Sequence, residues 1–150
     1  HFVETRKREG ENLKKDLEEK LDGLDREVVL VQERSPEVVT AYREKLEAKA
    51  KELLADSQID DSRIAAEVVL FSDKICNDEE TVRLRSHIQG MKKMLEEDEG
   101  IGRKLDFMAQ EMNREANTIL SKSNDLTISN IAIDLKTEIE KIREQIQNIE

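Results

Sequence analysis

Apolar residues recur every three or four positions along most of this chain, which is the spacing of one face of an α-helix. The first such stripe runs from Leu13 to Val31. It leads into "RSPEVV", where Ser35 is a favourable N-cap residue and Pro36 suits the first turn of a helix. A second stripe then follows at Val39, Tyr42, Leu46 and Leu53. The pattern therefore predicts a helical hairpin in residues 1–58.

Four more helices are expected in the rest of the chain. The third lies in "SRIAAEVVLFSDKI", after a break at residues 55–62, and the fourth begins with the capping-box pattern of Asn77 and Glu80. The turns "EEDEGIG" and "SKSND" separate the fourth, fifth and last helices. The apolar positions are, in order, Ile64, Val68, Val69 and Phe71; Leu84, Ile88, Met91 and Leu95; Leu105, Met108, Met112, Ala116 and Ile119; and Ile128, Ile131, Leu135, Ile139, Ile142, Ile146 and Ile149. The last repeat is close to a heptad, which indicates a coiled-coil seam.

The composition supports an all-α fold. Of the 150 residues, 40% are charged and 3% are aromatic, with one Pro and five Gly, and this balance is typical of long helices. We therefore expect long antiparallel helices in hairpins and a bundle, with coiled-coil-like seams. The first and last apolar stripes are hard to cover within one short chain, so we also expect a homo-oligomer.

Several features indicate a cytoplasmic protein. The single cysteine, Cys76, excludes an internal disulfide and suits a reducing compartment. No stretch approaches the roughly 18 apolar residues of a membrane span, and "HFVETRKREG" lacks the apolar core of a signal peptide. There is also no phosphate-binding glycine loop, so no membrane contact and no nucleotide cofactor are expected.

Charge is distributed unevenly along the chain. The formal net charge of −10 argues against a nucleic-acid partner. Residues 81–95, however, contain four basic residues and no acidic one, a local charge of +4, and they are Arg83, Arg85, Lys92 and Lys93. Basic side chains of this kind can contact phosphates. From composition alone, a solvated face with an incidental charge imbalance is the favoured interpretation.

One imidazole is a candidate proton carrier. His87 lies at the edge of an apolar stripe, and helical spacing places Glu80 and Arg83 on the same face. A half-buried imidazole beside an acid and a base could transfer protons. From spacing alone, a structural histidine bonded to a neighbouring group is the stronger reading.

Two carboxylates in the fifth helix are candidate metal ligands. Glu111 and Glu115 are four residues apart, so they face the same way and repel each other unless a positive group lies between them. That group could be Arg114 or a bound cation, and oxygen ligands suit Mg²⁺ or Mn²⁺. An ordinary Arg–Glu surface network explains the same residues.

Three ordered stretches resemble one protein family. "GRKLDFMAQEMNREANTILSKSND" is similar to the hallmark motif of the YicC/YloC family, and "LKTEIEKIREQIQNIE" is similar to the end of its proteins. "SRIAAEVVLFSDK" followed by "DEETVRLRSHI" resembles the preceding family segment in order and spacing. The similarity is close over residues 59–150 and looser over residues 1–58. It predicts a C-terminal helical domain in 59–150, joined by 1–58 to an N-terminal domain that this sequence lacks.

The resemblance implies a metal-dependent endoribonuclease that hydrolyses RNA, uses Mn²⁺ or Mg²⁺, and assembles as a hexamer. The alternative is a non-catalytic helical module for oligomerisation and RNA binding. The expected catalytic residues are His87, Glu80 and Glu115; the expected metal ligands are Glu67, Glu111 and Glu115; and the expected RNA-binding residues are Arg83, Arg85, Arg103, Lys104, Asn113, Arg114, Asn117 and Lys122.

These residues are expected to meet between the fourth and fifth helices. The short turn between those helices makes them antiparallel, which brings Glu80, Arg83 and His87 near Glu111 and Glu115. Such a cluster of carboxylates is costly unless a cation offsets it. A structural alternative is a buried polar network at a subunit interface.

Overall fold

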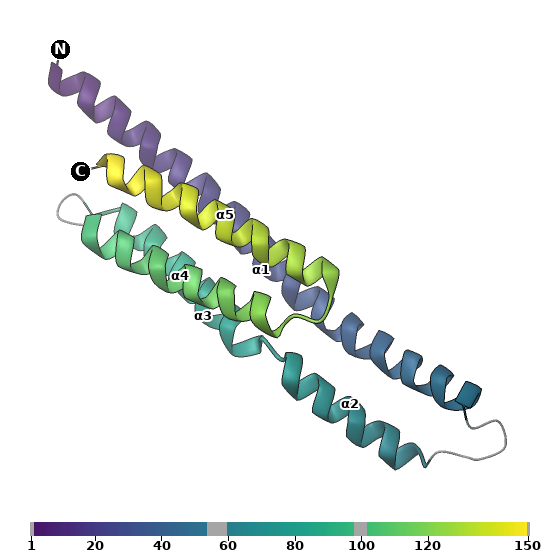
Figure 1. Ribbon diagram of the computed structural model, residues 1–150. Coiled ribbons are helices and arrows are strands. Elements are labelled where there is room, and N and C mark those ends of the chain that lie inside the picture. Colours follow the sequence, from purple (N-terminus) through teal and green to yellow (C-terminus); the bar gives the residue numbers. More distant parts are fainter. Residues whose placement is uncertain (1, 54–59, 98–101, 150) are drawn as a thin grey trace.

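The chain folds into helices, as the apolar pattern predicts. The computed structural model describes residues 2–53, 60–97 and 102–149. The helices are α1 (Phe2–Leu53), α2 (Asp61–Ile75), α3 (Asp78–Leu95), α4 (Gly102–Lys122) and α5 (Leu126–Ile149) (Figure 1). No strand occurs in these three ranges, so the predicted all-α fold is confirmed. No helix in the described ranges is long and apolar enough to span a membrane.

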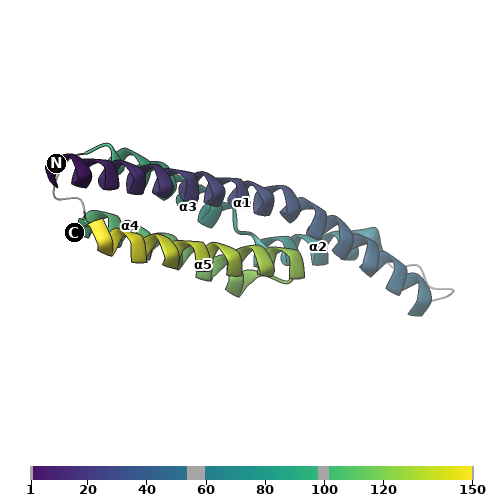
Figure 2. The ribbon, with the colours of Figure 1, turned by 90° about the horizontal axis from the view of Figure 1, so that it is seen from above.

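The first part of α1 forms a bundle with α3, α4 and α5, while the rest of α1 and α2 extend from it as an arm (Figures 1 and 2). Each bundle helix packs against two others, in the ring order α1, α3, α4, α5. Paired residues run in opposite directions along α1 and α3, where Gln32 contacts Thr81 and Arg85 contacts Asp25. The predicted antiparallel packing of α3 and α4 is confirmed by the ion pair of Arg83 with Glu115.

The apolar stripes meet inside the bundle. The largest fully buried side chains there are Leu17, Leu21, Leu24, Leu84, Ile88, Met91, Leu95, Leu105, Met112, Ile119, Leu135 and Ile139. The stripes of α1 and α5 therefore cover each other and the stripes of α3 and α4 within one chain. Our reason for expecting an oligomer, that one chain could not cover them, is wrong. Self-association and a coiled-coil seam stay predictions.

The expected hairpin in residues 1–58 does not form, because α1 continues through Pro36 as one helix. Proline removes one backbone donor and crowds the preceding turn. The apolar period nevertheless continues past it, and Val38 is buried in the same core as Val31. The Ser35 hydroxyl caps no helix; it donates to the Val31 carbonyl oxygen at 2.8 Å. Burial on the far side of the proline outweighs its local cost.

The hairpin in this part of the chain is instead made by α1 and α2. Asp60 caps α2 by accepting a hydrogen bond from the Ser62 backbone N–H at 3.2 Å. The Tyr42 ring of α1 stacks on the Phe71 ring of α2, with their centroids 3.8 Å apart. Residues 54–59, where most of the predicted break falls, and residues 98–101 of the predicted glycine turn lie outside the described residues. Buried residues of α1 and buried residues after position 58 belong to one hydrophobic core, so the core crosses the predicted domain boundary.

The capping box at the start of α3 is also absent. Asn77 occupies the N-cap position as predicted, but its side chain makes no capping hydrogen bond. Its Oδ1 atom lies 3.3 Å from the Ser35 hydroxyl oxygen. Glu80, the other half of the expected box, turns toward α4 and pairs with Lys122. Both side chains therefore contact other helices instead of each other's backbone.

Candidate functional site

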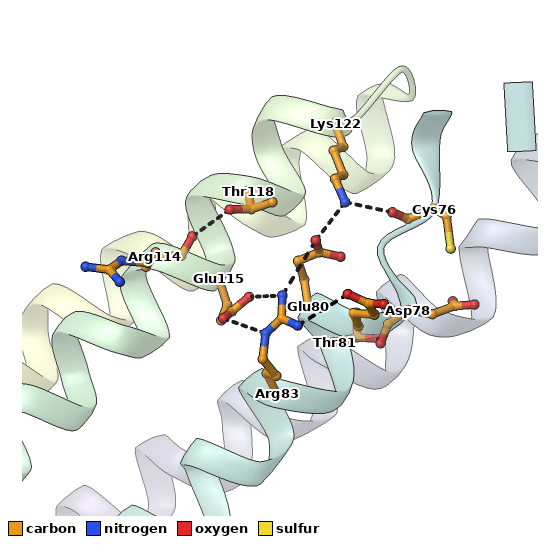
Figure 3. Close-up of polar contacts among 10 residues, drawn as sticks. Cys76, Asp78, Glu80, Thr81, Arg83, Arg114, Glu115, Thr118 and Lys122 are labelled. Atoms are coloured by element: carbon orange, nitrogen blue, oxygen red, sulfur yellow. Dashed lines mark hydrogen bonds and ion pairs between the residues drawn. The ribbon is translucent and has the colours of Figure 1, made fainter. Parts of the chain in front are cut away.

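Four charged side chains meet where the start of α3 passes the end of α4 (Figure 3). Glu80 and Arg83 come from α3, and Glu115 and Lys122 come from α4. Arg83 holds both oxygens of Glu115, with its Nε 2.9 Å and its Nη2 3.2 Å away. The Lys122 Nζ is 2.7 Å from Oε1 of Glu80. We call these four residues the α3–α4 cluster.

The cluster has buried carboxylates and partly exposed cations. Glu80 and Glu115 are only 4% and 7% exposed, whereas the side chain of Arg83 is 48% exposed. Burial alone would raise the pKa of Glu80, but the hydrogen bond from Lys122 and the nearby charge of Arg83 hold it below its ordinary value. The bond to Glu115 raises the pKa of Arg83. Glu80 is therefore ionised, and both cations still face solvent.

One carboxylate oxygen of the cluster is not used. Oε2 of Glu80 is buried and has no hydrogen-bond partner among the described residues. A buried acceptor without a donor is destabilising, so such groups in native proteins call for an explanation. Because this oxygen is shielded from solvent, a hydroxyl group from outside can donate to it only after a neighbouring side chain moves. Lys122 also donates to the Cys76 carbonyl oxygen at 3.2 Å, which fixes the ammonium group (Figure 3).

The expected reaction centre is therefore assembled only in part. The structure brings Glu80, Arg83 and Glu115 together, and it adds Lys122, which we had expected only to bind RNA. His87 lies one turn beyond Arg83 on α3 and is half-buried. It forms no hydrogen bond or ion pair with any described residue, and its predicted catalytic role stays a prediction.

The expected metal ligands are not gathered. Glu67 is exposed on α2, whose packing is against α1, while Glu115 is held by Arg83. Glu111 instead contacts Arg114, with the two side chains 3.5 Å apart. In the described parts of the chain, no three acidic, His or Cys side chains are placed to hold a metal ion. The residues of one chain thus do not fit a divalent metal at this point.

The positive charge of the expected basic face is largely offset by acidic side chains of α1. Arg85 forms an ion pair with Asp25 at 3.0 Å, and Lys92 forms one with Asp22. Both acids are distant in sequence, so the local charge of +4 could not reveal them. Of the basic residues in 81–95, Lys93 is exposed and has no ion-pair partner among the described residues.

The remaining expected RNA-binding residues lie along α4. Arg103, Lys104, Arg114 and Asn117 are exposed, and the side chain of Arg114 points away from the α3–α4 cluster (Figure 3). Asn113 is half-buried at the other edge of the apolar stripe, since it follows Ala109 by four residues. Among the described residues, neither asparagine forms a hydrogen bond with a member of the cluster, and their contact with RNA stays a prediction.

A second, partly buried ion pair was missed by the sequence reasoning. Arg34 of α1 donates to both oxygens of Asp125, at 3.1 Å and 3.0 Å, just before α5. Asp125 also caps α5 by accepting from the Ile128 backbone N–H at 3.1 Å. These bonds, the Arg34 side chain first, lower the pKa of Asp125. An Asp three residues before an apolar position is an N-cap signal, but nothing in the sequence indicates its partner.

Known proteins similar to this chain are named as endoribonucleases or probable endoribonucleases. The family described as "Endoribonuclease YicC-like, C-terminal" matches residues 31–150. The chain is 49% identical over 148 residues to "Probable endoribonuclease YicC" of Clostridioides difficile (strain 630), covering 98% of this chain and 50% of that protein. It is 39% identical over 149 residues to the protein of the same name from Haemophilus influenzae (strain ATCC 51907 / DSM 11121 / KW20 / Rd), covering 99% of this chain and 51% of that protein. The chain thus spans about half the length of these relatives, and it belongs to the YicC-like endoribonuclease family.

Proposed function

We propose that this chain is part of an endoribonuclease and that the α3–α4 cluster binds the RNA phosphodiester to be cleaved. The observation that carries the proposal is a half-exposed guanidinium and an ammonium group held beside a buried carboxylate oxygen without a donor. All four residues lie in the segments that resemble the hallmark sequences of the family.

Each group of the cluster has a defined task in this proposal. Arg83 and Lys122 contact phosphate oxygens through the donors that face solvent, and they stabilise the negative charge that grows during cleavage. Once the Lys122 ammonium group has turned to the phosphate, the Glu80 carboxylate accepts a hydrogen bond from the ribose 2′-hydroxyl, which is the group that distinguishes RNA from DNA. Glu115 orients Arg83 and is a positioning residue.

The first experiment tests the cluster in a full-length protein that includes this chain. Arg83→Gln and Lys122→Gln should each lower the cleavage rate of a labelled RNA hairpin by roughly 10²-fold, the usual effect of losing one transition-state donor. Arg43→Gln is the matched control, because Arg43 also loses an ion pair, with Glu47, but lies on the arm. Normal cleavage by both cluster variants would refute the proposal.

Metal dependence is a separate proposal, resting on the family resemblance alone. Because the described residues of one chain do not gather a ligand set, ligands would have to come from another copy or from the rest of the full-length protein. Cleavage of the same hairpin after chelation, and after return of Mn²⁺ or Mg²⁺, is the direct measurement.

A non-catalytic role in RNA binding and assembly is the second candidate for the 150-residue chain. The observation that favours it is that both cluster carboxylates are paired with cations, so neither carboxylate is free to act as a general base. In that case the 150-residue chain binds the hairpin without cutting it, and Arg83→Gln weakens binding. Cleavage by the full-length protein would then fall only as far as RNA occupancy falls.

A further inference from the structure

One exposed stripe of helix α4 carries no carboxylate. Its members are exposed and recur every three or four residues, which is the spacing of one helical face, and they are Arg103, Phe107, Gln110, Arg114, Asn117 and Ser121. We call these six residues the outer face of α4. Although 35 of the 150 residues are acidic, none of them lies on this stripe, so a negatively charged ligand can approach it.

The two acidic residues beside the outer face are already paired. Asp106 accepts from Nε of Arg143 at 3.2 Å and from Nε2 of Gln110 at 3.0 Å. Glu111 lies 3.5 Å from Arg114. The Arg114 side chain is nevertheless 74% exposed, and it points away from the α3–α4 cluster (Figure 3). A ligand on the outer face therefore meets a cation at a position separate from the cluster.

An aromatic ring lies in the middle of this polar stripe. Phe107 is 61% exposed, whereas Tyr42 and Phe71 stack on each other. The residues one turn away from Phe107 on α4 are all polar or charged, and they are Arg103, Lys104, Gln110 and Glu111. A protein partner normally meets a contiguous apolar patch. An isolated ring among cations and amides instead matches the aromatic side chains on which unpaired bases stack.

We propose that the outer face of α4 binds a single-stranded segment of the RNA substrate and that the Phe107 ring stacks on an unpaired base. The choice of RNA as ligand rests on the proposed function. The choice of a single strand rests on the ring, because the bases of a duplex are already stacked on one another. Arg103 and Arg114 lie on either side of the ring, roughly 6 Å and 10 Å along the helix axis, and contact the phosphates that flank the stacked base.

The outer face would select the substrate and would not cut it. Phe107 precedes Glu115 by eight residues on α4, so the stacked base lies about 12 Å along the helix from the level of the α3–α4 cluster. Phe107 is therefore a positioning residue for the strand that leads to the scissile phosphate. The preferred substrates are RNAs with an unpaired segment beside the cleavage position.

The test is the affinity of a full-length protein that includes this chain for an unstructured 2′-O-methyl RNA of about 12 nucleotides. This probe lacks the 2′-hydroxyl that the α3–α4 cluster recognises, so binding at the outer face is measured apart from cleavage. Phe107→Leu should weaken binding about tenfold, the loss of one stacked base, whereas Phe107→Tyr should bind like the wild type. Ile133→Ala is the control, because Ile133 is a 49% exposed apolar residue of α5, and it should leave the affinity unchanged.

Changes in the ligand and in salt separate the ring from the cations. An abasic strand, and a duplex of the same sequence, should each bind Phe107→Leu as well as they bind the wild type, because neither offers an unpaired base. Arg103→Gln and Arg114→Gln should each reduce the slope of the logarithm of the binding constant against the logarithm of salt concentration by about 0.7, the value for one phosphate contact of a single strand. Phe107→Leu should leave that slope unchanged.

Several outcomes would overturn the proposal. These are no binding of the probe by the wild type, wild-type affinity in Phe107→Leu, or an equal loss on the intact and the abasic strand. A lower oligomer mass of Phe107→Leu with unchanged RNA affinity would also overturn it, since the ring would then contact another protein chain. If the binding results are as expected but Arg83→Gln and Lys122→Gln cleave normally, the outer face stands and the proposed role of the cluster fails.

Discussion

At the scale of single residues, the α3–α4 cluster shows how two buried carboxylates are each paired with a cation. Glu80 and Glu115 are nearly inaccessible, and each is paired with a cation whose side chain is partly exposed. Breaking such a pair by removing one partner costs more than a surface ion pair contributes, because the remaining charge stays buried. The cations can nevertheless turn toward a phosphate, since their desolvation is incomplete.

The lowered pKa of Glu80 predicts a pH-dependent loss of stability in Lys122→Gln. The cost at pH 7 should be about 1–2 kcal/mol in the free energy of unfolding, below the range for a fully buried pair because Arg83 remains and Lys122 is 38% exposed. A depressed folded-state pKa contributes stability above the ordinary pKa of 4.5, and this is lost as the pH falls through the lower folded value. The difference from wild type should therefore shrink below about pH 4.5.

Urea unfolding at pH 7 and pH 3 measures this difference. Lys141→Gln is the control, because Lys141 forms a surface ion pair with Glu138 at 3.2 Å and should cost less than about 0.5 kcal/mol. An equal loss in both variants, or a loss in Lys122→Gln that persists at low pH, would contradict the assigned role of Glu80.

At the scale of elements, α1 demonstrates that local helix signals can be overruled. Ser35 and Pro36 form a helix-start pattern, yet the helix passes through them. The second part of α1 is retained because Val38 enters the core and Tyr42 stacks on Phe71. Contacts between α2 and the part of α1 that follows the proline therefore stabilise the arm.

If Pro36 is a tolerated defect inside α1, Pro36→Ala should stabilise the protein. Alanine restores a backbone donor and relieves crowding, so we expect a gain of about 1 kcal/mol, well under the full ~3 kcal/mol of an ideal helix. Chemical denaturation monitored at the helical circular dichroism signal gives the value. Lys45→Ala, at an exposed position of the same helix, should change stability by under about 0.5 kcal/mol. A loss of stability in Pro36→Ala would mean that the proline sets a bend the fold requires.

At the scale of the whole molecule, the bundle is a ring of four helices, and the first part of α1 is one of the four. Leu17, Leu21, Leu24 and Val28 are at most 1% exposed, and all four precede the family match, which begins at residue 31. A fragment that starts at residue 31 keeps the matched sequence but uncovers the apolar faces of α3 and α5.

We therefore predict that residues 31–150 alone do not unfold cooperatively, whereas residues 11–150 do. The shorter fragment loses four buried side chains, each contributing roughly 1.5–3 kcal/mol, and their sum is comparable to the whole stability of a small domain. Thermal unfolding by calorimetry and binding of a hydrophobic dye distinguish the two fragments. A sharp transition without dye binding in the shorter fragment would refute the prediction.

The candidate site could be predicted only where its residues share a helix. The grouping of Glu80 with Arg83 follows from their spacing, and the meeting of α3 with α4 follows from the shortness of the connection between them. The pairing of Arg85 with Asp25, and that of Arg34 with Asp125, joins residues far apart in sequence. Charge counted along a segment does not include such partners, so it overstated the positive potential of the α3 surface.

The sequence by itself determined the all-α class, the positions of α2 to α5 and most of the core in α3 to α5, because each depends on apolar spacing within one helix. The predicted apolar positions Leu53 and Val69 are 70% and 58% exposed, because no other described helix covers them. Tertiary structure alone decided that α1 continues through Pro36, that the long stripes cover each other within one chain, and that Glu67 stays apart from Glu115. These outcomes depend on which distant surfaces meet and on how much apolar area each meeting buries. Local propensities are small beside that burial, so packing between helices had the deciding effect.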